Sequence, residues 1–116
     1  MILASKEDIA KHTAAGWWGK ETISTRFRAN AAAAPDRTAI ADPPNREDID
    51  GQVPRRLTYR ELEAEADRIA TAFLDTGLTK DDVIAVQLPN TVDLVAVYLG
   101  AWRAGLIVTP FPVQWR

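Results

Sequence analysis

Few residues of this 116-residue chain could carry out acid–base, nucleophilic or metal chemistry. The single histidine, His12, could act as a general base, because histidine is the side chain that titrates near neutral pH without help. No partner group is evident beside it, so the sequence favours an exposed or locally bonded side chain. With no cysteine, the chain offers no thiolate nucleophile and no sulfur-based zinc site, which suits a reducing compartment.

Two pairs of neighbouring residues allow both a functional and a structural interpretation. Asp81 and Asp82 could form a pair of carboxylates for acid–base chemistry. They follow a predicted helix and precede a predicted strand, however, where aspartates more commonly form a turn. Trp17 and Trp18 could stack on a ligand or a nucleic-acid base, but no basic cluster accompanies them. We therefore expect the two tryptophans to fill a groove between elements.

The polar segment 43–54 is predicted to be a surface loop, because prolines mark both of its ends. Within it, the order of Asp48 and Asp50 superficially suggests a calcium-binding loop. The first ligand position is occupied by Arg46, however, and the twelfth by Leu57, where a bidentate glutamate is required. We therefore predict a solvated acidic loop and no metal site.

Composition and charge narrow the class of protein. The chain has 14 Lys and Arg against 16 Asp and Glu, so it has no basic excess for binding phosphate backbones, and we expect no nucleic-acid partner. A hydrophobic share of 47% is ordinary for a single globular domain. No apolar run approaches the ~20 residues of a membrane span, and the amino terminus lacks a secretion signal. We expect a cytoplasmic chain with no membrane contact.

In the first half of the chain, helix-capping residues and prolines predict where the secondary-structure elements begin and end. Thr22 is expected to cap a helix that ends at Ala34, because Pro35 cannot continue it. Two short strands, at 38–41 and 53–59, could then pair with each other across the polar loop.

The strongest local pattern is a helix from about residue 59 to residue 76. Thr58 and Glu61 have the spacing of a capping box at its start, and Gly77 supplies the left-handed residue that ends it. Phe73 lies on the apolar stripe of this helix. If it is buried, Phe73→Ala should cost about 3–5 kcal/mol.

The second half alternates strands and helices. Segment 83–88 (VIAVQL) is almost continuously apolar, which favours a strand covered on both faces of a parallel sheet. Asn90 can cap a further helix that Gly105 ends, and segment 106–109 is another buried strand. Counting the strand at 53–59, this order predicts an α/β fold with a βαβαβ parallel sheet of three strands, flanking helices, an N-terminal helix and a short β-hairpin.

A resemblance to a known family rests on five segments taken together. Residues 57–62 (LTYREL) and 102–110 (WRAGLIVTP) are similar to the first two core motifs of the adenylate-forming superfamily. Residues 83–90 (VIAVQLPN) resemble its strand and Leu-Pro-Asn turn, and 34–42 (APDRTAIAD) its early strand. Residues 16–19 (GWWG) resemble the lead-in of ligases that form 2,3-dihydroxybenzoyl adenylate and of cyclohexanecarboxylate-type CoA ligases. These segments follow the order and spacing of that superfamily.

The resemblance implies a chemistry for a longer parent protein. ATP, magnesium and a carboxylic acid would give an acyl-adenylate and pyrophosphate, and coenzyme A or a carrier phosphopantetheine would then take the acyl group. The phosphate loop, the nucleotide-contacting motifs, the hinge and the catalytic lysine of the family all lie downstream of Arg116. We therefore assign no catalytic, cofactor-binding or metal-binding residue here. Where the family commonly has Gly-Asp, this chain has Asp81-Asp82, and aspartate tolerates a left-handed turn.

The sequence thus predicts that residues 1–116 are a truncated amino-terminal subdomain of an acyl- or aryl-acid CoA ligase. It divides into a helical lead-in over 1–35 and an α/β unit over 36–116. By itself this fragment is expected to be inactive and to hold no cofactor, and the remainder of the ligase chain would be its partner. The alternative is a stand-alone α/β module for binding or interaction. An unprotected sheet edge also favours self-association.

Overall fold

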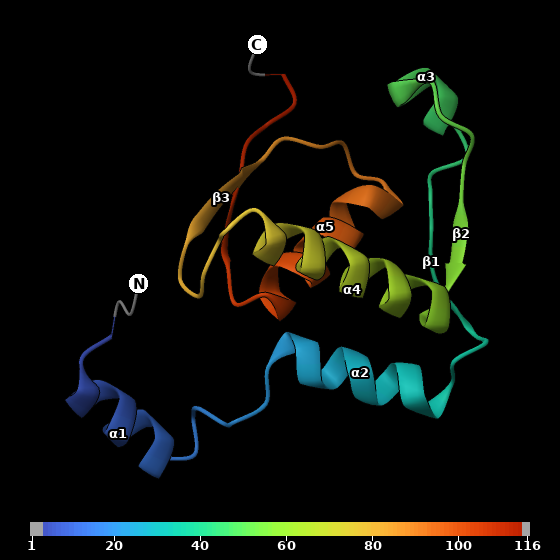
Figure 1. Cartoon of the computed structure of the whole chain (residues 1–116). Coiled ribbons are helices and arrows are strands. Elements are labelled where there is room, and N and C mark those ends of the chain that lie inside the picture. Colours follow the sequence, from blue (N-terminus) through green and yellow to red (C-terminus); the bar gives the residue numbers. More distant parts are fainter. Residues whose placement is uncertain (1–3, 115–116) are drawn as a thin grey trace.

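The computed structural model describes residues 4–114, in which the helices at 59–75 and 92–103 lie between two small pairs of strands (Figure 1). In chain order the elements are α1 (Lys6–Ala14), α2 (Ile23–Ala33), β1 (Thr38–Ala41), α3 (Arg46–Asp50), β2 (Arg56–Thr58), α4 (Tyr59–Asp75), β3 (Val83–Val86), α5 (Val92–Arg103) and β4 (Ile107–Pro110). None of the helices in this part of the chain is long and apolar enough to cross a membrane. Positions 1–3 and 115–116 of the predicted subdomain lie outside the described residues.

The strands form two separate pairs. Strands β1 and β2 are antiparallel, with Ile40 opposite Leu57, and β3 and β4 are parallel, with Val83 beside Ile107. The α/β class, the flanking helices and the short hairpin are therefore confirmed. The expected third parallel strand is not found among residues 4–114, because β2 pairs with β1 across the nearby loop rather than with β3. Closing this short loop costs less chain entropy than a distant pairing.

The core lies where α4 packs on α5, with α2 and the β1–β2 hairpin beside them (Figure 1). Its buried side chains are Leu62, Ala66, Ala96 and Leu99. The two helices approach so closely that a Cβ added at Gly100 would come within 2.6 Å of Ile69 Cγ2. Small residues on α5 thus allow the close packing that holds the two helices together.

Helix α4 begins as the sequence predicts. The Thr58 hydroxyl accepts a hydrogen bond from the Glu61 amide, and the Glu61 carboxylate accepts one from the Thr58 amide at 2.7 Å. Gly77, just beyond the helix, has a φ of 90°. Phe73, however, is only half-buried, because the last turn of α4 extends past the core. We therefore expect Phe73→Ala to cost less than the truncation of a fully buried ring.

Strand β3 is covered on one face only. Val86 is 6% exposed and faces the helices, whereas Val83 is 52% exposed and Ala85 is also exposed. The expectation of a strand covered on both faces is therefore wrong for the described residues. Two strands and the helix that joins them can close only one side of a sheet. In α5, the N-cap is Thr91 rather than the expected Asn90.

Candidate functional site

His12, Trp17 and Trp18 form a local cluster at the end of α1. The His12 ring centroid lies 5.3 Å from that of Trp17 and 5.0 Å from that of Trp18. Both tryptophan amides donate to the His12 carbonyl oxygen, because Gly16, at a φ of 74°, turns the chain back on the helix. Trp17 is 72% exposed, so the expectation that the pair fills a groove between elements is wrong. The His12 side chain is thus neither exposed nor hydrogen-bonded at Nδ1, which differs from the exposed or locally bonded histidine that the sequence favours.

Asp81 and Asp82 form the turn between α4 and β3. Asp81 adopts a φ of 72°, the left-handed conformation that aspartate tolerates. The Asp82 carboxylate accepts hydrogen bonds from the amide of Thr79 at 2.7 Å and from its hydroxyl at 2.9 Å. These bonds, the one from the amide first, hold the pKa of Asp82 below its ordinary value. The two residues therefore build the predicted turn.

Segment 43–54 is not simply a solvated acidic loop. It contains the short helix α3, and the side chain of Arg46 is 4% exposed although Asp48, two residues later, is exposed. Within residues 4–114 no group of three or more histidine, cysteine or carboxylate side chains could hold a metal ion. The burial of Arg46 was not predicted from the sequence.

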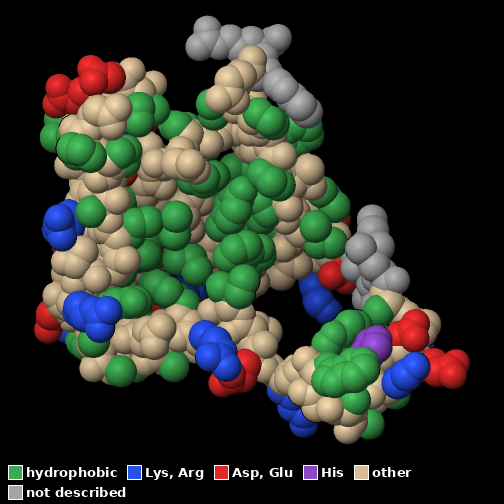
Figure 2. Space-filling view, turned by 180° about the vertical axis from the view of Figure 1, so that it is seen from behind, with side chains coloured by type: hydrophobic (Ala, Val, Ile, Leu, Met, Phe, Trp, Pro, Cys, Tyr) green, Lys and Arg blue, Asp and Glu red, His purple; other side chains and the backbone are tan. Residues whose placement is uncertain are grey.

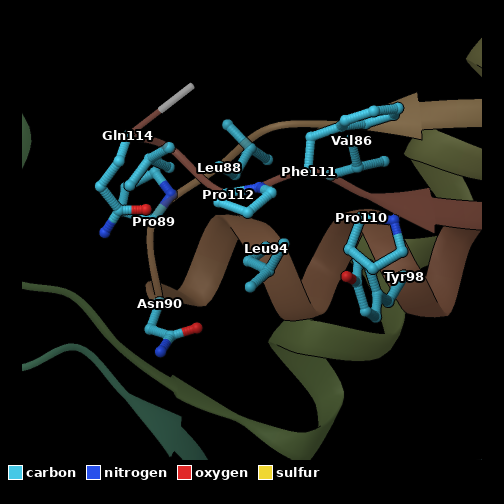
Figure 3. Close-up of a pocket in the computed structure, with 11 residues that line it drawn as sticks. Val86, Leu88, Pro89, Asn90, Leu94, Tyr98, Pro110, Phe111, Pro112 and Gln114 are labelled. Carbon is cyan, nitrogen blue, oxygen red and sulfur yellow. The ribbon is translucent and has the colours of Figure 1, made fainter. Parts of the chain in front are cut away.

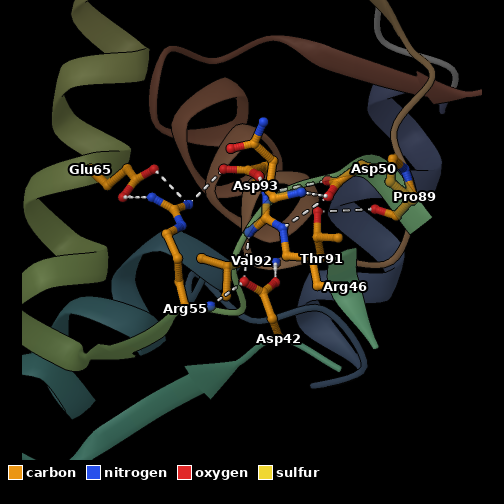
Figure 4. Close-up of polar contacts among 10 residues, drawn as sticks. Asp42, Arg46, Asp50, Arg55, Glu65, Pro89, Thr91, Val92 and Asp93 are labelled. Carbon is orange, nitrogen blue, oxygen red and sulfur yellow. Dashed lines mark hydrogen bonds and ion pairs between the residues drawn. The ribbon is translucent and has the colours of Figure 1, made fainter. Parts of the chain in front are cut away.

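Arg46 is buried because it binds Asp42, the residue after β1 (Figure 4). Arg46 Nη1 lies 2.5 Å from the Asp42 carboxylate, which also accepts hydrogen bonds from the backbone amides of Val92 and Arg55, each at 2.7 Å. The bond from Val92 caps the start of α5, where Thr91 makes no side-chain cap. One carboxylate therefore joins the hairpin, its loop and helix α5.

The same network makes further contacts within α3 and to α5, and extends to α4. Arg46 also contacts Asp50 in α3 and Asp93 in α5, and Arg55 reaches Asp93 at 2.6 Å and Glu65 in α4 at 3.3 Å (Figure 4). We call these six residues, Asp42, Arg46, Asp50, Arg55, Glu65 and Asp93, the hairpin–helix ion network. The spacing of Asp42 and Arg46 could have suggested a local pair, but nothing in the sequence pairs them with Asp93.

Hydrogen bonds and ion pairs keep Asp42 and Arg46, the two central members of this network, charged. Burial alone would raise the pKa of Asp42, but the hydrogen bonds from Val92, Arg46 and Arg55 outweigh it and hold that pKa below its ordinary value. The pKa of Arg46 is raised, first by its bond to Asp42 and, against the cost of burial, also by Asp50 and Asp93. The network is therefore a structural ion cluster rather than a source of protons near neutral pH.

A groove lies beyond the carboxyl ends of β3 and β4, the edge of a parallel sheet at which open α/β folds bind ligands. We call it the strand-end groove. Its volume is about 400 Å³. The lining residues are Val86, Leu88, Pro89, Asn90, Leu94, Tyr98, Pro110, Phe111, Pro112, Val113 and Gln114 (Figure 3).

The strand-end groove is apolar and contains no charged side chain among its described lining residues. Figure 3 shows Leu94 and Tyr98 rising from α5 toward the segment that starts at Pro110. The polar groups are the Tyr98 hydroxyl and the amides of Asn90 and Gln114. Such a surface can hold an uncharged apolar group and orient it by hydrogen bonds. Its described lining residues include no basic side chain and no histidine or carboxylate.

The ion network sets the position of this groove. Asp42 fixes the amide of Val92, two residues after Asn90, so the turn that forms one wall is attached to the hairpin. Asp50 of the network also lines a smaller hollow with Pro89 and Val113. The hairpin loop and the strand-end groove are therefore parts of one connected surface.

Comparisons of the sequence and of the fold with known proteins agree on the family of this chain. Residues 27–116 match the sequence profile of the AMP-binding enzymes. The chain is 37% identical over 98 residues to a salicyl-AMP ligase / salicyl-S-ArCP synthetase of Mycobacterium tuberculosis, covering 84% of this chain and 16% of that protein. It is 34% identical over 92 residues to a 2,3-dihydroxybenzoate-AMP ligase of Bacillus subtilis, covering 79% of this chain and 15% of the ligase.

The fold has solved counterparts too. The N-terminal subdomain of NpsA from Klebsiella oxytoca superposes with a TM-score of 0.68 at 23% identity, over 83% of this chain and 23% of that one. This likeness concerns the fold. The chain spans about one sixth of the length of the curated relatives it matches. By its match to the profile over residues 27–116, and by its resemblance to the amino-terminal part of these ligases, the chain belongs to the family of AMP-binding enzymes.

Proposed function

We propose that this chain is the amino-terminal scaffold of an ATP-dependent ligase. In the whole enzyme a carboxylic acid and ATP, with magnesium, would give an acyl-adenylate and pyrophosphate. Coenzyme A or a carrier phosphopantetheine would then accept the acyl group. The match of residues 27–116 to the AMP-binding enzymes carries this proposal. We also propose a cytoplasmic location, because ATP and coenzyme A are available to enzymes there.

The chain by itself is proposed to be catalytically silent. Adenylation needs cations and hydrogen-bond donors that stabilise charge on the transferring phosphate. The strand-end groove offers only apolar side chains, two amides and a phenol. The remainder of the ligase chain would therefore supply the reactive groups, and the residues described here would form one wall of its framework.

Aryl acids are the substrate class that we propose. The relatives named for salicylate and for 2,3-dihydroxybenzoate share 34–37% of their residues with this chain over the matched lengths. A fatty-acid CoA ligase of Escherichia coli shares 28% over 101 residues. Higher identity to the aryl-acid enzymes supports an aryl acid over a fatty acid.

ATP–pyrophosphate exchange with salicylate tests both parts of this proposal. The 116-residue chain alone should exchange no label above background. A chimera of the Mycobacterium tuberculosis ligase, with its matched 98 residues replaced by this chain, should exchange label with salicylate. The parent ligase is the positive control, and the same ligase without the matched segment is the negative control.

Two results would overturn the proposal. Exchange by the chain alone would show that it holds its own active site. A folded chimera that is inactive while the parent ligase works would show that the scaffold is not interchangeable, and would favour the alternative of a stand-alone binding or interaction module.

A further inference from the structure

Arg103, the last residue of α5, carries its charge on a buried side chain. This side chain is 8% exposed, whereas on the face of the molecule seen in Figure 2 charged side chains lie around the margins of a hydrophobic centre. Burying a charge is costly unless it is paired and hydrogen-bonded. The partners of Arg103 therefore indicate its role.

The side-chain hydrogen bonds of Arg103 in the described residues lead to α4. Its Nη1 donates to the Asp67 carboxylate at 2.6 Å and to the Glu63 carbonyl oxygen at 3.2 Å, and its Nη2 donates to the Glu63 carboxylate at 3.0 Å. Glu63 and Asp67 are neighbours on successive turns of α4, so the planar guanidinium spans one turn of that helix. An ammonium group is a point charge and cannot form the same fork of bonds.

These bonds hold α5 at its carboxyl end, as Asp42 holds it at its amino end. The Asp42 carboxylate accepts the hydrogen bond of the Val92 amide, at the first residue of the helix. A negative charge at the amino end and a positive charge at the carboxyl end also complement the helix dipole. Between the two ends, α5 contributes Leu94 and Tyr98 to the strand-end groove. The position of this wall of the groove therefore depends on both attachments.

The chain turns directly from Arg103 into β4. The Leu106 amide donates to the Ala101 carbonyl oxygen at 2.9 Å, and the Ile107 amide donates to the Asp82 carbonyl oxygen at 2.8 Å. Strand β4 then runs to the strand-end groove, which its last residue lines. A shift at the carboxyl end of α5 would therefore be passed through this turn to β4.

We propose that Arg103 is a positioning residue. By attaching the carboxyl end of α5 to α4, it fixes the turn into β4 and, through α5 and β4, two walls of the strand-end groove. The importance of this for catalysis rests on the proposed function, because the groove lies at the sheet edge where open α/β folds bind ligands. The positioning itself does not rest on it, and it can be measured in the 116-residue chain.

Arg28 of α2 provides a matched control within the chain. It approaches the same two carboxylates, with Nε 3.4 Å from Glu63 and Nη2 3.7 Å from Asp67, but its side chain is 57% exposed. An exposed ion pair at such distances contributes little. The two arginines thus share their partners and differ in burial, so only the loss of Arg103 should move α5.

Hydrogen exchange of backbone amides measures the positioning. In Arg103→Ala we expect the hydrogen-bonded amides of Ile107 and Phe111, at the two ends of β4, to exchange about tenfold faster or more. The amide of Val92, at the other end of α5, should change less than about twofold in the same molecule. Arg28→Met should leave all three amides within about twofold of wild type. Circular dichroism confirms that each variant is folded.

Guanidinium chloride separates the loss of these bonds from a general loss of packing. The Nε of Arg103 makes no hydrogen bond in the described structure, so a free guanidinium ion carries every donor that the side chain uses. Millimolar guanidinium, far below denaturing concentrations, should restore slow exchange in Arg103→Ala. Equal concentrations of sodium or methylammonium chloride should not, and Arg103→Lys should recover only part of the protection.

Four results would overturn the proposal. Equal acceleration of the Val92 and Ile107 amides would indicate a general loss of stability, and unchanged exchange at Phe111 would show that the groove is independent of Arg103. An effect of Arg28→Met as large as that of Arg103→Ala, or recovery in sodium chloride as complete as in guanidinium, would exclude the specific attachment. None of these measurements uses ligase activity, so they and the ATP–pyrophosphate exchange assay can fail independently.

Discussion

The Asp42 carboxylate accepts a hydrogen bond from the backbone amide of Val92 at 2.7 Å, so the residue that follows strand β1 caps a helix that begins 50 positions later. Most helices are capped by a side chain next to their own first turn. Here the local N-cap, Thr91, makes no such bond. The attachment of α5 to the hairpin thus depends on a tertiary contact, and its strength can be measured.

Replacing Asp42 with alanine should lower the free energy of unfolding by about 3 kcal/mol. The change removes the cap of α5 and leaves the buried Arg46 with fewer counter-charges, and the loss of one member of a buried ion pair costs this much. Urea unfolding followed by circular dichroism measures the effect. Asp48→Ala is the matched control, because this exposed carboxylate in the same loop should contribute less than about 0.5 kcal/mol. Equal effects of the two substitutions would contradict the role of Asp42.

The contribution of Asp42 should also depend on pH in a defined direction. Its folded pKa lies below the ordinary value of 3.8, so its stabilisation is fully present above that value and is lost as the pH falls through the folded pKa. The difference in unfolding free energy between wild type and Asp42→Asn should therefore be constant near neutrality and shrink below about pH 4. Unfolding titrations of both proteins across the acid range measure this. A difference that grows in acid would contradict the assignment.

Gly100→Ala should destabilise the packing of α4 on α5. Alanine normally gains about 1 kcal/mol over glycine inside a helix. At this position its Cβ would meet Ile69 Cγ2 at 2.6 Å and Ile69 Cβ at 2.8 Å, which outweighs that gain, so we expect a net loss of about 1–2 kcal/mol. Gly19→Ala is the comparison, since its nearest atom lies 3.9 Å away. Thermal unfolding of both variants distinguishes them, and a stabilised Gly100→Ala would show that the helices can separate freely.

When side chains along α4 are truncated to alanine, the loss of unfolding free energy should depend on their burial rather than on their size. Leu62 is 2% exposed in the core, so Leu62→Ala should cost about 3 kcal/mol. Leu74 is 50% exposed, so Leu74→Ala should cost less than about 1 kcal/mol. Phe73→Ala should fall between these two values, because its ring is half-buried. Chemical unfolding of the three variants gives the order, and a larger loss for Phe73→Ala than for Leu62→Ala would contradict it.

Where a structural feature depends only on neighbouring residues, the sequence was sufficient to predict it. The capping box of Thr58 and Glu61, the left-handed Gly77 and the end of α2 before Pro35 follow from neighbouring residues, and all of them are found. The Asp81-Asp82 turn belongs to the same class. The ion network was missed, because its bonds join residues up to 50 positions apart and no local pattern encodes them.

Two other differences between the predicted and the observed structure also have a physical cause. An apolar run such as Val83–Val86 indicates a strand but not how much of the protein will cover it, and here only one face is covered. Trp17 and Trp18 were expected between elements, since aromatic rings usually bury there. The turn at Gly16 instead folds them onto His12, a contact that the sequence alone gave no reason to expect.

The bare face of β3 has a consequence for biosynthesis. Once these residues have emerged from the ribosome ahead of later segments, Val83 and Ala85 are exposed to water beside a strand edge that is unpaired within residues 4–114. If translation of a longer ligase pauses there, the nascent protein is exposed to aggregation until later segments arrive. Chaperones that shield apolar strands should then bind most strongly at this stage of synthesis.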